Sequence, residues 1–337
     1  MAVPSPITAR LQYFALRCGA SLLNIFDIED NLAGARGIGS VMFRIDKRHR
    51  RRAVANIQHC FPEFDAAHCE RIAERSMQHF LQLGAEVLFT PRMIHLRSWP
   101  DRVAFHNLAQ ALDLMLADRP KLLLTGHFGN WELLGYALAT VGLDTDAIAR
   151  PLDNPLINDY LMGIRERQGV RIITKWLATD RMSRVMQSNG TLAFIGDQNA
   201  GDKGLFVPFF GRLASAYKSI GLLAINFDAP VICGYARRTP LGPQHHFHYD
   251  IGTTDIIHPD DWKSQPDPLF YLTARYSRAV EQMIRLAPEQ YLWMHRRWKS
   301  RPRHEREGKP MPAALRRKLE ALPWMTDALM RDLGKPV

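Results

Sequence analysis

The spacing of hydrophobic residues differs between two parts of the chain. Up to about residue 115, apolar residues recur every three or four positions, which is the spacing of one face of an α-helix. The pattern is clear after Pro62, in Ile72, Met77, Phe80, Leu81 and Val87. From residue 121 onward, short apolar runs instead alternate with helical stretches. We therefore predict a helical, membrane-associating region over residues 1–115, an α/β core over 116–303 and a charged C-terminal tail over 304–337.

The apolar runs of the core have the length of buried strands. They are KLLLT, DAIAR, VRIIT, TLAFIG and APVICGYA, with predicted helices between them. Strands and helices that alternate at this spacing are typical of an α/β fold with a mostly parallel sheet flanked by helices. The segment HHFHYDIG, residues 245–252, is expected to form an edge strand. Prolines among the charges of residues 304–337 predict a loosely docked tail.

The N-terminal segment predicts an amphipathic helix. Residues 7–26 are largely apolar, but Arg10, Arg17 and Asn24 recur every seven positions and form a polar stripe. An arginine at the centre of a bilayer costs about 2.5–3.5 kcal/mol, so we do not expect this segment to span a membrane. The same charges interrupt the apolar region that a signal peptide needs. The periodicity fits a helix lying in the membrane interface and equally a helix packed on the protein's own core.

The chain carries an excess of positive charge. It has 44 Lys and Arg against 34 Asp and Glu, a formal net charge of +10, which predicts attraction to an anionic surface or ligand. A basic run follows the amphipathic segment: Arg44, Lys47, Arg48, Arg50, Arg51 and Arg52. Beside that segment, the run favours peripheral binding to an anionic membrane surface. No recognised nucleic-acid-binding motif accompanies it, so we predict no nucleic acid partner.

A histidine and a glutamate follow the first apolar run of the core. In KLLLTGHFGNWELLGY, the strand ends just before His127, Asn130 can cap the next helix, and Glu132 lies in its first turn. Open α/β sheets place their ligands at the ends of parallel strands. An imidazole whose tautomer is fixed by a carboxylate is a suitable general base. We therefore predict that His127 takes a proton from a hydroxyl while Glu132 orients it. A buried histidine beside a helix-capping glutamate is the structural alternative.

Four segments, in this order, resemble one bacterial family. They are GHFGNWELLG, ARPLDNPLIND, GDQNAGDKGLFVPFFGRLAS and APEQYLWMHRRWKSRP. The resemblance covers roughly residues 45–302 and is to the bacterial lipid A biosynthesis acyltransferases, the lauroyl and myristoyl transferases of the lysophospholipid and glycerophosphate acyltransferase superfamily. It implies a glycerophosphate-acyltransferase-like fold. It also implies transfer of an acyl chain from acyl carrier protein to a hydroxyl of a lipid A precursor, at the cytoplasmic face of the inner membrane, without metal or cofactor.

The resemblance also assigns site residues. His127 and Glu132 match the family's HxxxxE dyad, Arg150 matches its R-P block, and Asp197 with Gln198 matches its D-Q block. The planar guanidinium of Arg150 suits an anionic group or charge developing on the thioester oxygen, and a structural ion pair is the alternative. Asp197 and Gln198 are expected at another strand end, where they can bond sugar hydroxyls or order Arg150. Ordinary turn chemistry is their alternative.

Three further residues are predicted to contact the substrate. We include Asn130 because of its place beside the dyad. Phe209 and Phe210, in FVPFFG, are expected to wall the acyl chain, with packing in the protein core as the alternative. No metal site is predicted, because the cysteines are scattered and the histidines near residue 246 have no carboxylate or cysteine partner nearby.

The sequence thus predicts an acyltransferase bound peripherally, or weakly anchored, at the cytoplasmic face of the cell inner membrane. Its expected partners are acyl carrier protein as donor, a glycolipid as acceptor and the anionic membrane surface. A lysophospholipid or glycerol-phosphate acyltransferase with the same dyad is the first alternative. A basic membrane-binding protein without catalytic activity is the second.

Overall fold

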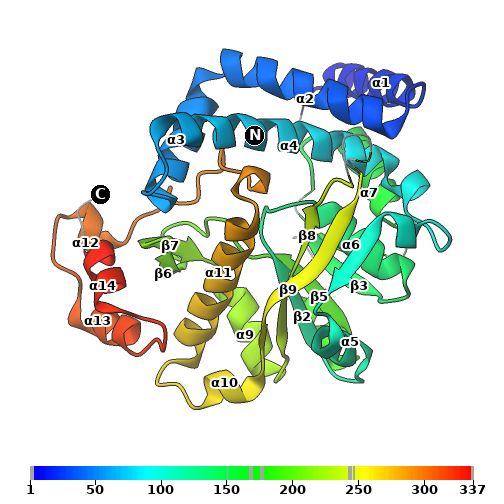
Figure 1. Ribbon diagram of the computed structural model, residues 1–337. Coiled ribbons are helices and arrows are strands. Elements are labelled where there is room, and N and C mark those ends of the chain that lie inside the picture. The colour runs from blue at the N-terminus through cyan, green and yellow to red at the C-terminus, as the bar shows by residue number, and fades with distance from the viewer. Residues whose placement is uncertain are drawn as a thin grey trace.

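The centre of the protein is a mostly parallel sheet. The computed structural model describes residues 4–149, 151–166, 170–174, 178–241, 245 and 247–334. In this part of the chain, seven strands follow the order β1, β9, β8, β2, β5, β3, β4 (Figure 1). Neighbouring strands are parallel except β8 and β9, which are antiparallel. The strands are β1 (Val103–His106), β2 (Lys121–Thr125), β3 (Thr145–Ala149), β4 (Val170–Thr174), β5 (Thr191–Ile195), β8 (Val231–Arg238) and β9 (Tyr249–Ile257). The predicted α/β fold is confirmed.

Two of these strands depart from the sequence prediction. Residues 249–252 of the segment expected at the sheet edge begin β9, which lies inside the sheet between β8 and β1. The strand at that edge of the sheet is β1, whose residues fall in the region predicted to be helical. A run of four residues is too short for strand alternation to be told from a helical pattern.

Alternate residues of the central strands face opposite sides of the sheet. On β2, Leu122 and Leu124 belong to one hydrophobic cluster, whereas Leu123 packs on another. The first cluster includes residues of α9 (Lys218–Asn226) and α11 (Pro268–Leu286), and the second includes residues of α5 (Ala109–Leu116) and α6 (Trp131–Thr140). Burial on both faces explains why the strands are continuous apolar runs. The other helices around the sheet are α7 (Pro155–Glu166), α8 (Ala178–Gln187) and α10 (Pro259–Lys263), with the short 3-10 helix η1 (Trp99–Asp101) before β1.

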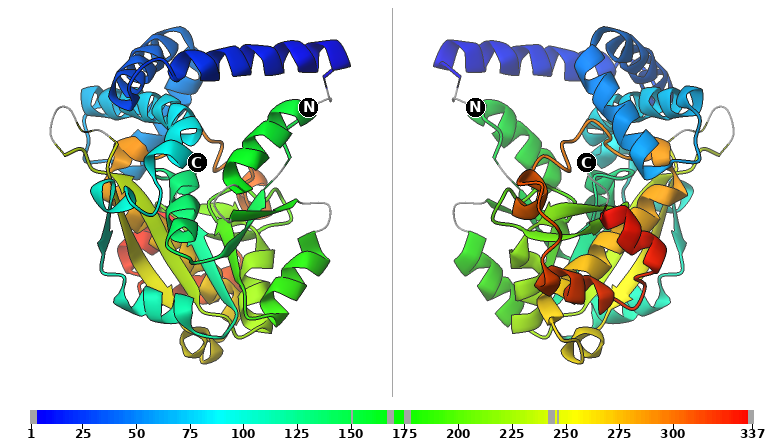
Figure 2. Two further views of the ribbon diagram at one scale, coloured as in Figure 1. Left: turned by 90° about the vertical axis from the view of Figure 1, so that its right-hand side faces the viewer. Right: turned by 90° about the vertical axis from the view of Figure 1, so that its left-hand side faces the viewer.

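In the described residues, four α-helices precede η1 and β1 and form the predicted N-terminal helical layer. They are α1 (Pro6–Leu23), α2 (Ile28–Ile45), α3 (Lys47–Cys60) and α4 (Ala66–Met93). Helices α2 and α4 pack along each other, and α1 extends beside α7 (Figures 1 and 2). Among the helices that the structure describes, none combines the length and apolar character that crossing a bilayer needs.

The C-terminal residues pack on the core rather than forming a loosely docked tail. They fold into α12 (Arg303–Arg306), α13 (Ala313–Glu320) and α14 (Asp327–Leu333), drawn in orange and red in Figure 2. Leu319, Leu322 and Leu333 are buried and join the hydrophobic cluster of α11. These leucines are separated by charged residues, so they form no continuous apolar pattern along the chain.

Candidate functional site

Strand pairing brings His127 and Asp197 together. Strands β2 and β5 are neighbours, and Thr125 pairs with Ile195, so the residues two positions further along both strands emerge side by side. The Nδ1 atom of His127 lies 2.8 Å from Oδ1 of Asp197, and the His127 backbone N–H donates to Oδ2 at 3.1 Å. Asp197 is only 2% exposed, so its carboxylate is shielded from solvent.

The Asp197 carboxylate fixes the protonation of the His127 ring. Since a carboxylate accepts, Nδ1 carries the proton and Nε2 keeps its lone pair. Burial alone would lower the pKa of His127, but the charge and hydrogen bond of Asp197, with a contribution from Glu132, raise it overall. Burial likewise opposes ionisation of Asp197, yet His127, His295 and Arg297 hold its pKa well below the ordinary value. The pair is therefore a charged carboxylate bracing an imidazole that can accept a proton.

The loop that carries His127 is held by a second loop, which follows the 3-10 helix η3 (Pro288–Gln290). The Leu292 backbone N–H donates to the His127 carbonyl at 3.0 Å, and the Gly129 N–H donates to the Gln290 carbonyl at 3.0 Å. This pairing places the His295 ring on the His127 ring, with centroids 5.5 Å apart. Gly129 has φ +59°, and a Cβ there would lie 2.0 Å from the Ala236 carbonyl oxygen, so only glycine fits.

Glu132 bonds a different partner from the one that the sequence predicted. Its two oxygens accept from Arg165 on α7, Oε2 from Nε at 2.8 Å and Oε1 from Nη2 at 2.5 Å. The expected hydrogen bond to His127 is therefore replaced by an ion pair with Arg165, and Asp197 takes its place on the imidazole. The HxxxxE spacing placed both residues at the same strand end correctly, but it carries no information on which carboxylate reaches the ring.

A cavity of about 740 Å³ opens beside this cluster. His127, Glu132 and Arg165 line it, together with Gln198 and Trp131. The rest of the lining is mainly apolar, from strands of the sheet and from helices that include α5 and α6. It includes Leu108, Ala111, Met115, Leu123, Leu134 and Ile232. A base in the wall of a mainly apolar cavity suits a substrate with a reactive polar group on a long apolar chain.

Comparison with known proteins agrees with this geometry. The model of the family described as bacterial lipid A biosynthesis acyltransferase matches residues 14–300. The chain belongs to this family. The lipid A biosynthesis lauroyltransferase of Escherichia coli (strain K12) is 26% identical over 275 residues, which are 79% of this chain and 84% of that protein. The palmitoleoyltransferase of the same strain is 27% identical over 276 residues, covering 79% and 83% of the two chains. The predicted family and the predicted acyltransferase class of enzyme are confirmed.

Three of the residues predicted to bind substrate do not line the cavity. Asn130 is fully buried: its Oδ1 caps α6 by accepting from the Leu133 N–H at 2.9 Å, and its Nδ2 donates to Glu86 at 2.8 Å. Phe209 and Phe210 belong to the hairpin of β6 (Leu205–Phe209) and β7 (Arg212–Ala216). Both rings are packed in the core, and neither is among the described residues that line the cavity.

The predictions for Gln198, Arg150 and Asp197 have different outcomes. Gln198 lines the cavity, as a substrate-binding residue would. Arg150 lies outside the described residues, and its role stays a prediction. Asp197 follows the end of β5, a strand end as expected, but its carboxylate bonds His127 and no sugar-binding position is open to it.

Two residues of the lipid A acyltransferase site were not predicted as such from the sequence. Arg165, which binds Glu132, lies in a helix with no motif around it. His295 lies in APEQYLWMHRRWKSRP, one of the four segments that carry the family resemblance, but no site residue was assigned there. Its position on His127 depends on the pairing of two loops that are far apart in the chain. No local pattern reveals that pairing.

Proposed function

We propose that this acyltransferase moves a fatty acyl chain from an acyl carrier protein thioester to a hydroxyl of a lipid A precursor or related glycolipid. The observation that carries the proposal is that His127, bonded to Asp197, lines a mainly apolar cavity of about 740 Å³. Burying an acyl chain there is favourable at about 25 cal/mol per Å² of apolar surface. The names of the lauroyl and palmitoleoyl relatives support a fatty acyl donor.

In the proposed reaction His127 is the general base. Its Nε2 takes the proton of the acceptor hydroxyl while Nδ1–H stays bonded to Asp197. The acceptor oxygen attacks the thioester carbonyl, a C–O bond forms, and the C–S bond breaks as the tetrahedral intermediate collapses. The thiolate leaves and receives the proton from the His127 imidazolium. The acyl chain thereby becomes an ester of the acceptor, and the carrier regains its thiol.

The Glu132–Arg165 ion pair is proposed to orient the acceptor. Both side chains line the cavity beside His127, and about a quarter of each is exposed there. Glu132 also contributes to the raised pKa of His127. A guanidinium and a carboxylate at one site can bind the polar groups of a sugar together. Gln198, on the same lining, adds an amide donor and acceptor.

We further propose that the protein binds peripherally to the cytoplasmic face of the inner membrane through α1 and α2. Large apolar side chains on these helices face solvent, with Ile7, Leu11 and Phe14 of α1 65–74% exposed. This exposure supports the interfacial alternative for the N-terminal helix over packing on the protein's own core. The basic run of residues 44–52 lies at the end of α2 and in α3, where it can meet anionic lipid.

The test is an assay of products. Purified protein is incubated with an acyl carrier protein thioester and, separately, a lipid A precursor, a lysophospholipid and glycerol phosphate, and the lipids are analysed by mass. We expect the acyl mass on the lipid A precursor, and its loss by about 10²-fold or more in His127→Ala. Acylation of lysophospholipid or glycerol phosphate alone would reject the proposed acceptor. Activity retained in His127→Ala would reject the proposed base.

A further inference from the structure

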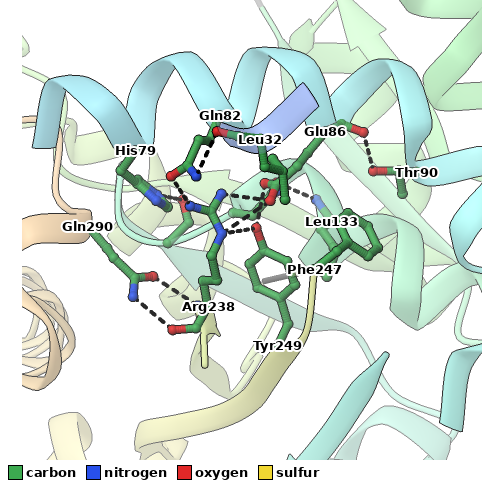
Figure 3. A network of polar contacts seen from close by, with 12 residues as sticks. Leu32, His79, Gln82, Glu86, Thr90, Leu133, Arg238, Phe247, Tyr249 and Gln290 are labelled. Atoms are coloured by element: carbon green, nitrogen blue, oxygen red, sulfur yellow. Dashed lines mark hydrogen bonds and ion pairs between the residues drawn. The ribbon is translucent and has the colours of Figure 1, made fainter. Parts of the chain in front are cut away.

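Helix α4 buries three polar side chains behind the catalytic loop. His79, Gln82 and Glu86 lie on one face of the helix and point into the protein, as Figure 3 shows. Each is at most 6% exposed. Burial lowers the pKa of His79 to about 3, with Arg238 contributing, and keeps the ring neutral. Because a carbonyl accepts, Nε2 carries the proton and donates to the Gly129 carbonyl at 3.0 Å. Burying a polar group is costly unless it is hydrogen-bonded, and each of these side chains has a hydrogen-bond partner.

The centre of the network is an ion pair between Glu86 and Arg238. Arg238, the last residue of β8, donates from Nη2 and Nε to Oε1 of Glu86 at 2.6 and 3.1 Å. Its Nη1 donates to Gln82 at 2.5 Å, and the Tyr249 hydroxyl donates to the other oxygen of Glu86 (Figure 3). Burial raises the pKa of Glu86, and Arg238, Tyr249 and Asn130 oppose that rise. Arg238 thus provides the buried counter-charge for Glu86.

The network reaches the loop of His127 at three points. Asn130 donates from Nδ2 to Oε2 of Glu86 at 2.8 Å, while its backbone N–H donates to the Ala236 carbonyl at 2.8 Å. His79 holds the Gly129 carbonyl. Gln290, whose carbonyl accepts from the Gly129 N–H, also exchanges two hydrogen bonds with the backbone of Arg238. The residues just after His127 are therefore fixed by α4, β8 and η3 together.

We propose that Glu86 and Arg238 are positioning residues for acyl transfer, which fix His127 through Asn130, Gly129 and Gln290. The inference rests on the proposed function. Replacing a buried ion pair by apolar residues is often neutral or stabilising, so stability alone is a weak reason for this pair. A base must be held within a fraction of an ångström of its productive position, and a bonded supporting network provides that.

The test removes both charges together. Glu86→Gln/Arg238→Gln leaves amides in place of the ion pair and no unpaired buried charge. We expect kcat to fall at least tenfold while KM for donor and acceptor changes less than twofold. The downfield proton resonance of the His127 Nδ1–H, bonded to Asp197, should shift or broaden in the folded variant. A purely structural role would leave that resonance and the kcat of the folded fraction unchanged, and that result would overturn the inference.

Two further variants keep the test decisive. Tyr249→Phe removes one donor to Glu86 and keeps the ring and both charges. It therefore provides the test of the inference when the double variant does not fold. We expect a several-fold loss of kcat, and wild-type kcat would overturn the inference. Asp255→Asn/Arg275→Gln is the matched control, because that pair joins β9 to α11 with contacts of 2.9 and 3.0 Å. No hydrogen bond of the described residues links it to the loop of His127, so its kcat should be kept. An equal loss in the control would overturn the inference.

Failure of the inference differs from failure of the proposed function. If the wild-type protein transfers no acyl chain to any glycolipid, the proposed function fails. If the wild-type protein transfers and the Glu86 and Tyr249 variants keep kcat, only the positioning role fails.

Discussion

At the scale of single residues, the pKa of His127 depends on the carboxylate that its ring bonds. Burial lowers this pKa, while Asp197 and, less strongly, Glu132 raise it above the ordinary value of 6.5. The proposed base must be neutral to take a proton, so the rate should fall as the pH falls through the raised pKa. Asn at position 197 would remove the charge and lower the pKa of His127. The acid limb of the rate profile should then move to lower pH, with a smaller maximal rate.

The sequence predicted where site residues lie along the chain relative to the strands, but not which of them contact one another. Placing His127, Glu132, Asp197 and Gln198 at strand ends needed only the apolar runs before them. Choosing Asp197 over Glu132 as the partner of His127 needed the pairing of β2 with β5, which brings position 127 beside position 197. Strand pairing is a tertiary property, so it cannot be read from the residue spacing within the HxxxxE motif.

At the scale of secondary structure elements, α6 forms much of the cavity wall. Gly135 lies one turn after Trp131 and Glu132 and lines the cavity. A Cβ at Gly135 would meet only the Val170 side chain, at an ordinary contact distance of 3.8 Å. An added methyl group is therefore tolerated, and a longer side chain would occupy space in the cavity.

We predict that Gly135→Leu shifts donor preference toward shorter acyl chains. The measurement is competition among thioesters of different chain length, with the products separated by mass. Gly135→Ala is the control, since Ala stabilises a helix relative to Gly by roughly 0.5–1 kcal/mol and adds little volume. An unchanged chain-length preference in Gly135→Leu would show that this wall does not contact the acyl chain.

Long, strongly patterned elements were predictable, and short or charged ones were not. Five core strands and the α/β alternation follow from apolar runs buried on both faces. Strand β1 has four residues, and α13 buries one leucine, Leu319, among charged neighbours, so neither produces a period long enough to identify. Phe209 and Phe210 show a further limit: aromatic content predicts burial, but not which cavity or cluster the rings join.

At the scale of the whole molecule, exposed apolar side chains and positive charge occur on the same helices. Ile7, Leu11 and Phe14 are exposed on α1, and Ile38 and Ile45 are exposed on α2. The basic run of residues 44–52 continues from the end of α2. A net charge of +10 adds attraction to an anionic surface. The proposed peripheral binding combines apolar insertion with electrostatic attraction, which together allow reversible binding without a span.

We predict that Leu11→Ser/Phe14→Ser weakens binding to vesicles that contain anionic lipid. Co-sedimentation measures the bound fraction, and Ser21→Asn, at an exposed polar position of the same helix, is the control. Raising the salt concentration should weaken the wild-type protein's binding, because screening reduces the contribution of the basic run. Equal binding by the double variant and the control would contradict a membrane role for α1.

The most direct test of the central claim is the pH dependence of kcat/KM for acyl transfer to the lipid A precursor, in the wild-type protein and in Asp197→Asn. We predict an acid limb above pH 6.5 in the wild-type protein, as the direction of the His127 pKa requires. In Asp197→Asn the limb should lie at lower pH, with a maximum reduced by about 10²–10⁴. A limb and a maximum that are the same in both proteins would contradict the claim that Asp197 holds His127 as the base.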